Sequence, residues 1–339
     1  MAKYTAIGGQ ALIEGIMMKG PKKTALAVRT PQKTIDISYM NEKTLRQKFA
    51  ILRIPVIRGI AAYIESMLQG YKAMMISADK SGFTDLEEEA DKKDEKGTSA
   101  LISIVMLIGT ILGVALAVVL FMGVPRYAVK GLEWLVGTPF SKVARASIEQ
   151  LIKLVVLVGY MALISLMKDI KRVFMYHGAE HKTIFCYEKG LPLTVENARI
   201  QSRFHPRCGT SFLILMIVIS ILFSTLVQII FPSVYETAWV WIAIKILLVP
   251  LICGVGFEVL RFCGKYDNLF TRIISAPGLW MQRITTKEPS DDMLEIAIAA
   301  LKACEGDTPD VERPAEEEAT ETEDTTEAID TEIQSEEEN

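Results

Sequence analysis

The longest uncharged apolar run in the chain limits its fold more than any other feature. Residues 100–124 contain no charged side chain, and a helix needs only about 20 apolar residues to cross a bilayer. Three further apolar runs resemble it and make four in all: 100–124, 151–167, 212–231 and 238–260. The run at 151–167 is the shortest and contains Lys153, whose stem could snorkel to the interface. The sequence therefore predicts a mainly α-helical, multi-pass membrane protein with about four transmembrane helices.

Charge divides the chain into a cationic body and an acidic tail. Residues 305–339 hold sixteen Asp and Glu against one basic residue, so residues 1–304 keep 36 basic and 25 acidic side chains. We expect the tail to be disordered, and the charged segment 83–99 to be a solvated linker before the membrane domain at 100–304. A cationic, apolar body suits anionic lipid. The basic residues lack interleaved exposed aromatics, which argues against nucleic acid and leaves the lipid bilayer as the expected partner.

The distribution of Lys and Arg predicts the orientation in the membrane. The connection 168–211 holds eight basic residues and segment 261–304 holds six, whereas 232–237 holds none. Basic segments stay in the cytoplasm. We therefore expect both termini and the His-rich loop 168–211 to be cytoplasmic. If 151–167 did not span, everything after it would invert.

The first 43 residues carry short-range β signals. Thr24–Arg29 and Thr34–Tyr39 are rich in alternating apolar and β-branched residues, and Pro31 lies in the turn between them. Proline presets a turn dihedral, so the pair predicts a small N-terminal β-hairpin. Residues 8–21 are punctuated by glycine, and such a backbone can approach another segment or a ligand closely.

Residues 44–82 predict an amphipathic helix at the membrane interface. Arg58, Glu65 and Lys72 recur every seven residues with Gln69 on the same side, and the remaining surface is mostly apolar. One polar stripe on an apolar helix is typical of a helix that lies on the membrane or packs against the spanning bundle. A buried helix of a soluble domain is the alternative.

All three histidines of the chain lie between residues 177 and 205. If the chain is helical here, His177, Glu180 and His181 share one face. Two histidines four residues apart can bind one metal, and the carboxylate between them can accept a proton from bound water. This pattern makes Glu180 the candidate general base.

Arg203–Thr210 contributes the rest of the candidate site. It contains His205 and Cys208 beside a proline and a glycine, which indicate a turn. A catalytic zinc site uses three protein ligands and leaves one position for water. The predicted ligands are therefore His177, His181 and His205, with Cys208 as a contested fourth. In the alternative, the histidines bind lipid phosphates or cap helices near the interface.

Three other ionisable residues are weaker candidates. Glu14 could supply a carboxylate from a different element, although a surface glutamate is the simpler interpretation. Glu258 and Lys245 fall in a predicted span, where burying charge is costly. They are thirteen residues apart and cannot pair within one straight helix. A local ion pair of Glu258 with Arg261 is preferred, so Glu258 ranks below His205 as a ligand.

Four blocks resemble a family of bacterial membrane proteins, the YqhQ-like proteins. The blocks are GGQALIEGIMMKGP, YHGAEHKTIFCYEKG, LTVENARIQSRFHPRCGTSF and PGLWMQRITTKEPSDDMLEIAIAAL. The resemblance runs from residue 4 to about residue 301 and leaves out the charged linker and the acidic tail. It implies a multi-pass protein of the bacterial cell membrane, of unknown function and often described as a metal-dependent enzyme. Cys186 lies where no family motif requires a cysteine, so it is not a predicted ligand.

These features together predict a membrane-embedded metal-dependent enzyme. The expected activity is that of a zinc hydrolase at the cytoplasmic interface, with a divalent metal as its cofactor. The rival interpretation is a non-catalytic scaffold or transporter with a structural metal or none. Cys208 as a fourth ligand would close the site and favour that rival. The pattern leaves the substrate and the oligomeric state open.

Overall fold

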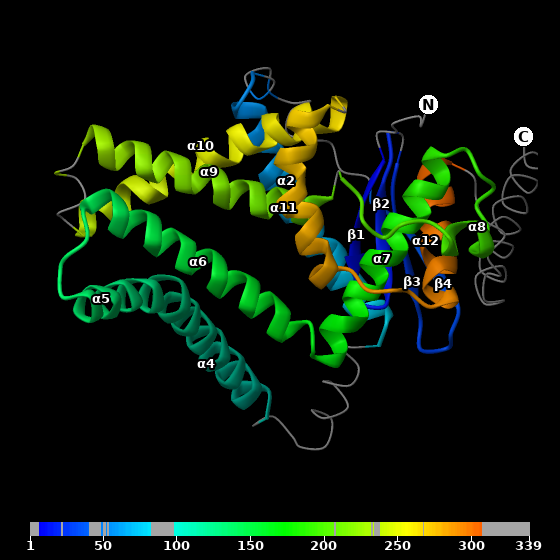
Figure 1. Cartoon of the computed structure of the whole chain (residues 1–339). Coiled ribbons are helices and arrows are strands. Elements are labelled where there is room, and N and C mark those ends of the chain that lie inside the picture. Colours follow the sequence, from blue (N-terminus) through cyan, green and yellow to red (C-terminus); the bar gives the residue numbers. More distant parts are fainter. Residues whose placement is uncertain are drawn as a thin grey trace, which may run out of the picture. The chain divides into compact units, whose positions relative to one another are not determined.

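The computed structural model describes most of the chain up to residue 306. The described residues are 7–21, 23–40, 54–82, 98–206, 208–231, 238–266 and 268–306, with Phe49, Leu52 and Ser233. The acidic tail from residue 307 and most of the predicted linker, 83–97, lie outside them. A small sheet packed between helices is followed by a group of long apolar helices (Figure 1).

The N-terminal sheet is larger than the predicted hairpin. Its four antiparallel strands follow one another in sequence order: β1 (Gly8–Leu12), β2 (Gly15–Lys19), β3 (Thr24–Arg29) and β4 (Ile35–Met40). The expected hairpin corresponds to β3 and β4, where Arg29 pairs with Ile35. The glycine-rich segment 8–21 forms β1 and β2, whereas the sequence predicted only that its backbone could approach another segment closely. These two strands have the few-residue turn and backbone pairing of a hairpin, with Leu12 opposite Gly15.

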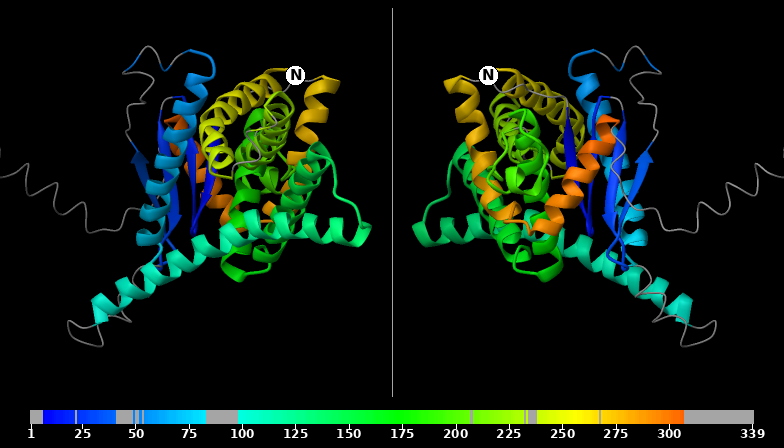
Figure 2. Two further views of the ribbon diagram at one scale, coloured as in Figure 1. Left: turned by 90° about the vertical axis from the view of Figure 1, so that its left-hand side faces the viewer. Right: turned by 90° about the vertical axis from the view of Figure 1, so that its right-hand side faces the viewer.

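Alternating residues of the sheet face two different helical layers. One face packs on α7 (Lys168–Glu188) and α12 (Asp291–Glu305) through Ile16, Met18, Ala25 and Ala27. The other face packs on α2 (Ile57–Lys80) through Leu12, Met17 and Leu26, which meet Ala73. This two-residue period is what a strand buried on both faces requires. Figure 2 views the arrangement from two further sides.

The long apolar helices form the second part of the fold. They are α4 (Thr98–Val118), α5 (Val124–Val136), α6 (Lys142–Ile164), α9 (Gly209–Ile230), α10 (Ala238–Lys265) and α11 (Leu269–Thr285). Three stretches are long and apolar enough to cross a membrane: Ile108–Val136, Val143–Ile164 and Ala243–Cys263. In α9 the described apolar stretch is shorter, Leu215–Val227. The described residues thus show three candidate spans where four were predicted.

Two segments outside the predicted spans are helical. The first apolar helix continues past residue 124 through a π-helical turn (Val119–Gly123) into α5. Pro125 follows that turn, and the wider π spacing accommodates a residue that lacks the amide hydrogen. The connection 168–211 consists mainly of α7 and the short α8 (Val195–Arg199), so His177 and His181 lie on a helix, while His205 lies in the segment between α8 and α9.

Candidate metal centre

The buried side of α7 carries the histidine pair. His177, Glu180 and His181 lie within little more than one helical turn, and their side chains are 8%, 5% and 1% exposed. The helical placement expected from their spacing is therefore present, and α7 lies against both the sheet and α12. A helix this polar can be buried only if its polar side chains find partners.

The backbone between α11 and α12 (residues 286–290), called the strap below, packs against α7. The connection between α11 and α12 crosses the helix at Gly178, where an added Cβ would overlap the carbonyl oxygen of Lys287. The Lys287 amide donates to the carbonyl of Phe174 at 2.8 Å. Glycine at residue 178 thus lets the strap approach closely enough for Thr285, the last residue of α11, to reach His177.

Both imidazoles of α7 are oriented by backbone carbonyls. His177 Nδ1 lies 2.8 Å from the Thr285 carbonyl oxygen, and His181 Nδ1 lies 2.5 Å from that of Arg203. A carbonyl oxygen only accepts hydrogen bonds, so both Nδ1 atoms must carry the proton. Each Nε2 atom then presents a lone pair, which is the tautomer that metal-binding histidines adopt when a partner fixes the other nitrogen.

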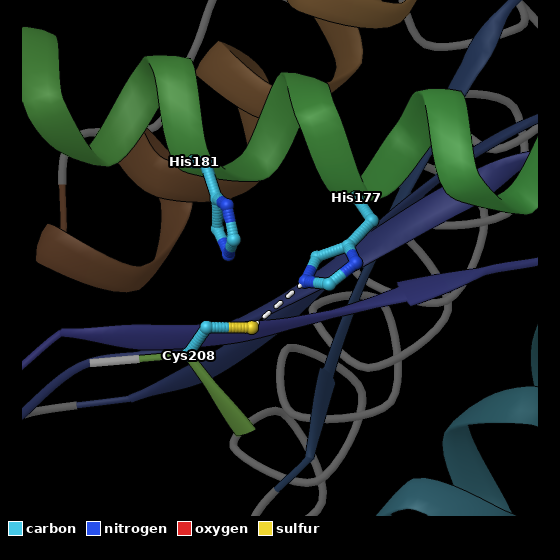
Figure 3. A group of neighbouring side chains, drawn as sticks. All are labelled: His177, His181 and Cys208. Carbon is cyan, nitrogen blue, oxygen red and sulfur yellow. Dashed lines mark hydrogen bonds between the residues drawn. The ribbon is translucent and has the colours of Figure 1, made fainter. Parts of the chain in front are cut away.

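The two Nε2 atoms face the thiol of Cys208, which immediately precedes α9 (Figure 3). The Cys208 Sγ lies 3.0 Å from His177 Nε2, and the three ligand atoms all lie within 4.8 Å of one another. In a tetrahedral zinc site, with bonds of 2.0–2.3 Å, such atoms are separated by about 3.3–3.6 Å. The donor set and its spacing therefore fit one divalent metal with small side-chain adjustments.

The ring nitrogen of His181 supplies the strongest sign of a missing partner. In the described part of the chain, three buried side-chain atoms make no hydrogen bond: His181 Nε2, Arg29 Nε and Thr183 Oγ1. Of these, only His181 Nε2 belongs to the cluster of potential ligands. A buried acceptor without a partner loses its hydration, which a metal bond would replace.

His205 lies beside this cluster and is not one of its members. Its ring centroid is 5.6 Å from that of His181, and its Nε2 lies 3.4 Å from the Glu188 carboxylate. The side chain of Gln282 accepts from the His205 amide at 2.8 Å and donates to its carbonyl at 2.7 Å. Burial lowers the pKa of His205 to about 4, so the contact with Glu188 is a hydrogen bond from a neutral ring. The structure thus groups Cys208 with His177 and His181 and leaves His205 outside.

Glu180 is held by the first strand of the sheet. The Gly9 amide donates to its carboxyl group, and a Cβ on Gly9 would lie 2.8 Å from Glu180 Cδ. Burial raises the pKa of Glu180 to about 8, while His177 and the Gly9 amide oppose this shift. Cys208 acts on the same carboxyl group and raises its pKa. Glu180 therefore lies close enough to His177 and Cys208 for the charges of these two residues to shift its pKa.

The remaining candidates lie elsewhere. Glu14, at the β1–β2 turn, pairs with Arg172 and accepts from Tyr176 at 3.1 Å. Glu258 makes no local pair of the kind expected with Arg261. It accepts two hydrogen bonds from Arg58, at 2.6 and 2.5 Å.

Lys245 and Cys186 have other neighbours as well. Lys245 of α10 meets Lys153 and Glu149 of α6. The Cys186 thiol lies 3.4 Å from the carbonyl of Pro192. Neither residue belongs to the cluster.

Sequence reasoning missed the groups that orient the cluster and its neighbours Glu180 and His205. They are the carbonyls of Thr285 and Arg203, the amide of Gly9 and the side chain of Gln282. Backbone groups have no signal in a sequence. All four residues do lie within the blocks quoted above for their resemblance to a family.

Residues 54–307 match the family described as "Protein of unknown function (DUF1385)". The chain belongs to this family. It is also 37% identical over 300 residues to the "Uncharacterized protein YqhQ" of Bacillus subtilis (strain 168), an alignment that covers 87% of this chain and 91% of that protein. No solved structure matches the chain. The family membership agrees with the resemblance in sequence and assigns no chemistry.

The strap at Gly178 generates a stability prediction. Gly178→Ala should lower the melting temperature of the detergent-solubilised protein, because the added Cβ displaces the Lys287 carbonyl. Gly159→Ala is the matched control, since a Cβ there would meet no atom within 4 Å beyond its chain neighbours and the backbone of its own helix. Both changes gain the same helix propensity of about 1 kcal/mol. Equal melting temperatures for the two variants would contradict the close contact.

Proposed function

We propose that this protein is a membrane-bound metalloprotein with a hydrolytic centre at the cytoplasmic interface. His177, His181 and Cys208 would hold one divalent metal, zinc being the ion that best suits two imidazoles and a thiolate. The observation that carries the proposal is the buried Nε2 of His181, which faces the other two ligand atoms without a hydrogen-bond partner. A metal-free pair of His177 and Cys208 would account for their contact at 3.0 Å but would leave His181 Nε2 without a hydrogen bond of ordinary geometry.

The ligand count supports an enzyme over a structural site. Three protein donors leave one position for a substrate or water, as in catalytic zinc sites, whereas structural sites use four. The rival, a scaffold or transporter with a structural metal, gains support only if His205 turns from Glu188 towards the metal. Its backbone is fixed by both hydrogen bonds of Gln282, which favours the open site.

The residues around the centre have distinct proposed roles. When bound, a divalent metal polarises a substrate oxygen and activates water. The carbonyls of Thr285 and Arg203 keep both imidazoles in the ligand tautomer. Glu180, fixed by the Gly9 amide, is the group that can take and return a proton beside the cluster.

The membrane arrangement follows from the position of Cys208. Because Cys208 directly precedes α9, the centre lies at the membrane boundary if α9 spans. We propose four spans, formed by the α4–α5 helix, α6, α9 and α10, with both termini and α7 on the cytoplasmic side of a bacterial cell membrane. The basic residues of 168–211 support this orientation.

The first test measures metal content. Purified protein should carry about one zinc or iron per chain by elemental analysis. His181→Ala should lose most of it, because one neutral nitrogen ligand disappears. His205→Ala is the matched control and should retain the metal. Full retention by the His181 variant would remove the site as proposed, and loss from both variants would indicate a closed, four-ligand centre.

The second test distinguishes an enzyme from a non-catalytic scaffold that holds a structural metal. Glu180→Gln keeps an oxygen that can accept from the Gly9 amide and removes the ionisable carboxyl group. We expect normal abundance, unchanged metal content and loss of complementation of a deletion phenotype, since losing a positioned group that can give or take a proton costs about 10²–10⁴ in rate. Full complementation with metal still bound would favour the scaffold.

The third test concerns topology. A cysteine placed at Lys189 should stay protected from a membrane-impermeant thiol reagent in intact cells, while one placed at Ser233 should react. Lys189 follows α7 and Ser233 lies between α9 and α10. The reverse pattern would place the candidate centre outside the cell.

A further inference from the structure

Helix α2 turns its polar side inward. Glu65 and Gln69 are 5% and 7% exposed, and Gln69 accepts a hydrogen bond from Lys19 of β2 at 2.7 Å. Further along, the Ser77 hydroxyl donates to the carbonyl of Ile13 in the β1–β2 turn. Glu65 and Gln69 of the polar stripe recognised in the sequence therefore face inward, whereas Lys72 of the same stripe is exposed.

The opposite side of α2 is apolar and exposed. Five large side chains are between 45% and 68% exposed: Ile64, Met67, Leu68, Tyr71 and Met75. Their spacing follows one helical stripe. A surface helix of a water-soluble protein has the reverse arrangement, with its apolar side in the core and its polar side in solvent. Such a continuous apolar stripe indicates an environment other than water.

The start of α2 lies against a helix that can span the membrane. Gly59 packs closely on Gly254 and Phe257 of α10, and Arg58 forms a two-pronged ion pair with Glu258. These α10 residues lie five to nine positions before the end of the candidate span at Cys263. At 1.5 Å per residue, this is about 8–14 Å inside the boundary. The first turn of α2 is therefore at the depth of lipid chains.

From this point α2 leaves α10 and follows the sheet. In Figure 1 it crosses the direction of α9 and α10 steeply, and in Figure 2 it runs alongside the strands. Tyr71 and Lys72 lie in the exposed part of its second half. Both side chains combine an apolar body with a polar tip and suit the headgroup layer. The exposed stripe is thus continuous with the lipid-facing surface of the bundle.

We infer that α2 is an in-plane membrane helix whose exposed stripe lies in the boundary between headgroups and acyl chains. The occupant of this surface is lipid. The sheet then rests on the bilayer through α2. Gln10 of β1 packs directly on Gly70 of α2, and the neighbouring Gly9 holds Glu180. This places the candidate centre beside the interface, whether or not the proposed chemistry is correct.

Site-directed spin labelling tests the inference. Four of the five native cysteines are buried and Cys263 is only partly so, which makes Cys263→Ala a suitable background. Single cysteines would replace Met67, Tyr71 and Met75 in protein reconstituted in lipid nanodiscs. Leu247, 76% exposed in the α10 span, is the lipid control. Glu295, exposed on α12, is the water control.

The measurement is the collision rate of each nitroxide with oxygen and with a water-soluble nickel chelate. Labels on the α2 stripe should match Leu247, with high oxygen and low nickel accessibility, while Glu295 should show the opposite. Nickel accessibility on the stripe would overturn the inference. So would protection from both reagents with spin–spin broadening, which would identify a second copy of the chain. If a label at one position disturbs folding, a label at Ile64 or Leu68 replaces it. This substitution is possible because the accessibility of labels along residues 64–75 should follow the helical period rather than depend on one position.

Discussion

The burial of α7 is the constraint on which the rest of the structure depends. A helix with this many polar side chains enters the interior only if each one is satisfied. Lys182 illustrates the rule, since its ammonium group donates to the Arg199 carbonyl and pairs with Glu288, both at 2.8 Å. The carbonyl of Thr285, at the end of α11, and that of Arg203, in the turn before α9, meet the same requirement for His177 and His181. Two buried atoms of α7 are left out of this pairing, Thr183 Oγ1 and His181 Nε2, and of the two only His181 Nε2 faces other potential metal ligands, at the candidate centre.

The same pairing connects the centre to the apolar helices. Thr285 ends α11 and Cys208 precedes α9, so two of the groups that define the cluster lie at helix ends next to apolar segments. A displacement of either helix would move a carbonyl or a thiol relative to α7. By contrast, Gly9 connects Glu180 to the sheet and not to these helices. The proton-carrying group and the ligand atoms are thus supported by different parts of the fold.

Much of this arrangement could be predicted from local patterns. Apolar length gave the long helices, the Pro31 turn gave β3 and β4, and the spacing of His177, Glu180 and His181 indicated one helical face. The sequence ranked His205 above Cys208 as the third ligand, whereas the structure groups Cys208 with His177 and His181. The ranking failed because both residues follow α7 in a turn whose geometry the sequence does not specify. It also assigned Glu258 to Arg261, three residues away, whereas the partner is Arg58, 200 residues earlier. Local rules rank near partners first, and a pairing between distant helices leaves no local trace.

Helix α2 shows a further limit of pattern analysis. The recurrence of Arg58, Glu65 and Lys72 identified a polar stripe but not the side on which the protein lies. In water the hydrophobic effect decides this, because apolar side chains turn to the core. Next to a bilayer that driving force is absent, since lipid solvates apolar side chains as well as a protein core does. Hydrogen bonds and ion pairs then decide which side faces inward, and most of the polar stripe becomes the packed side, with Lys72 left exposed. The direction of an amphipathic stripe thus depends on the solvent, which must be known before the stripe can be oriented.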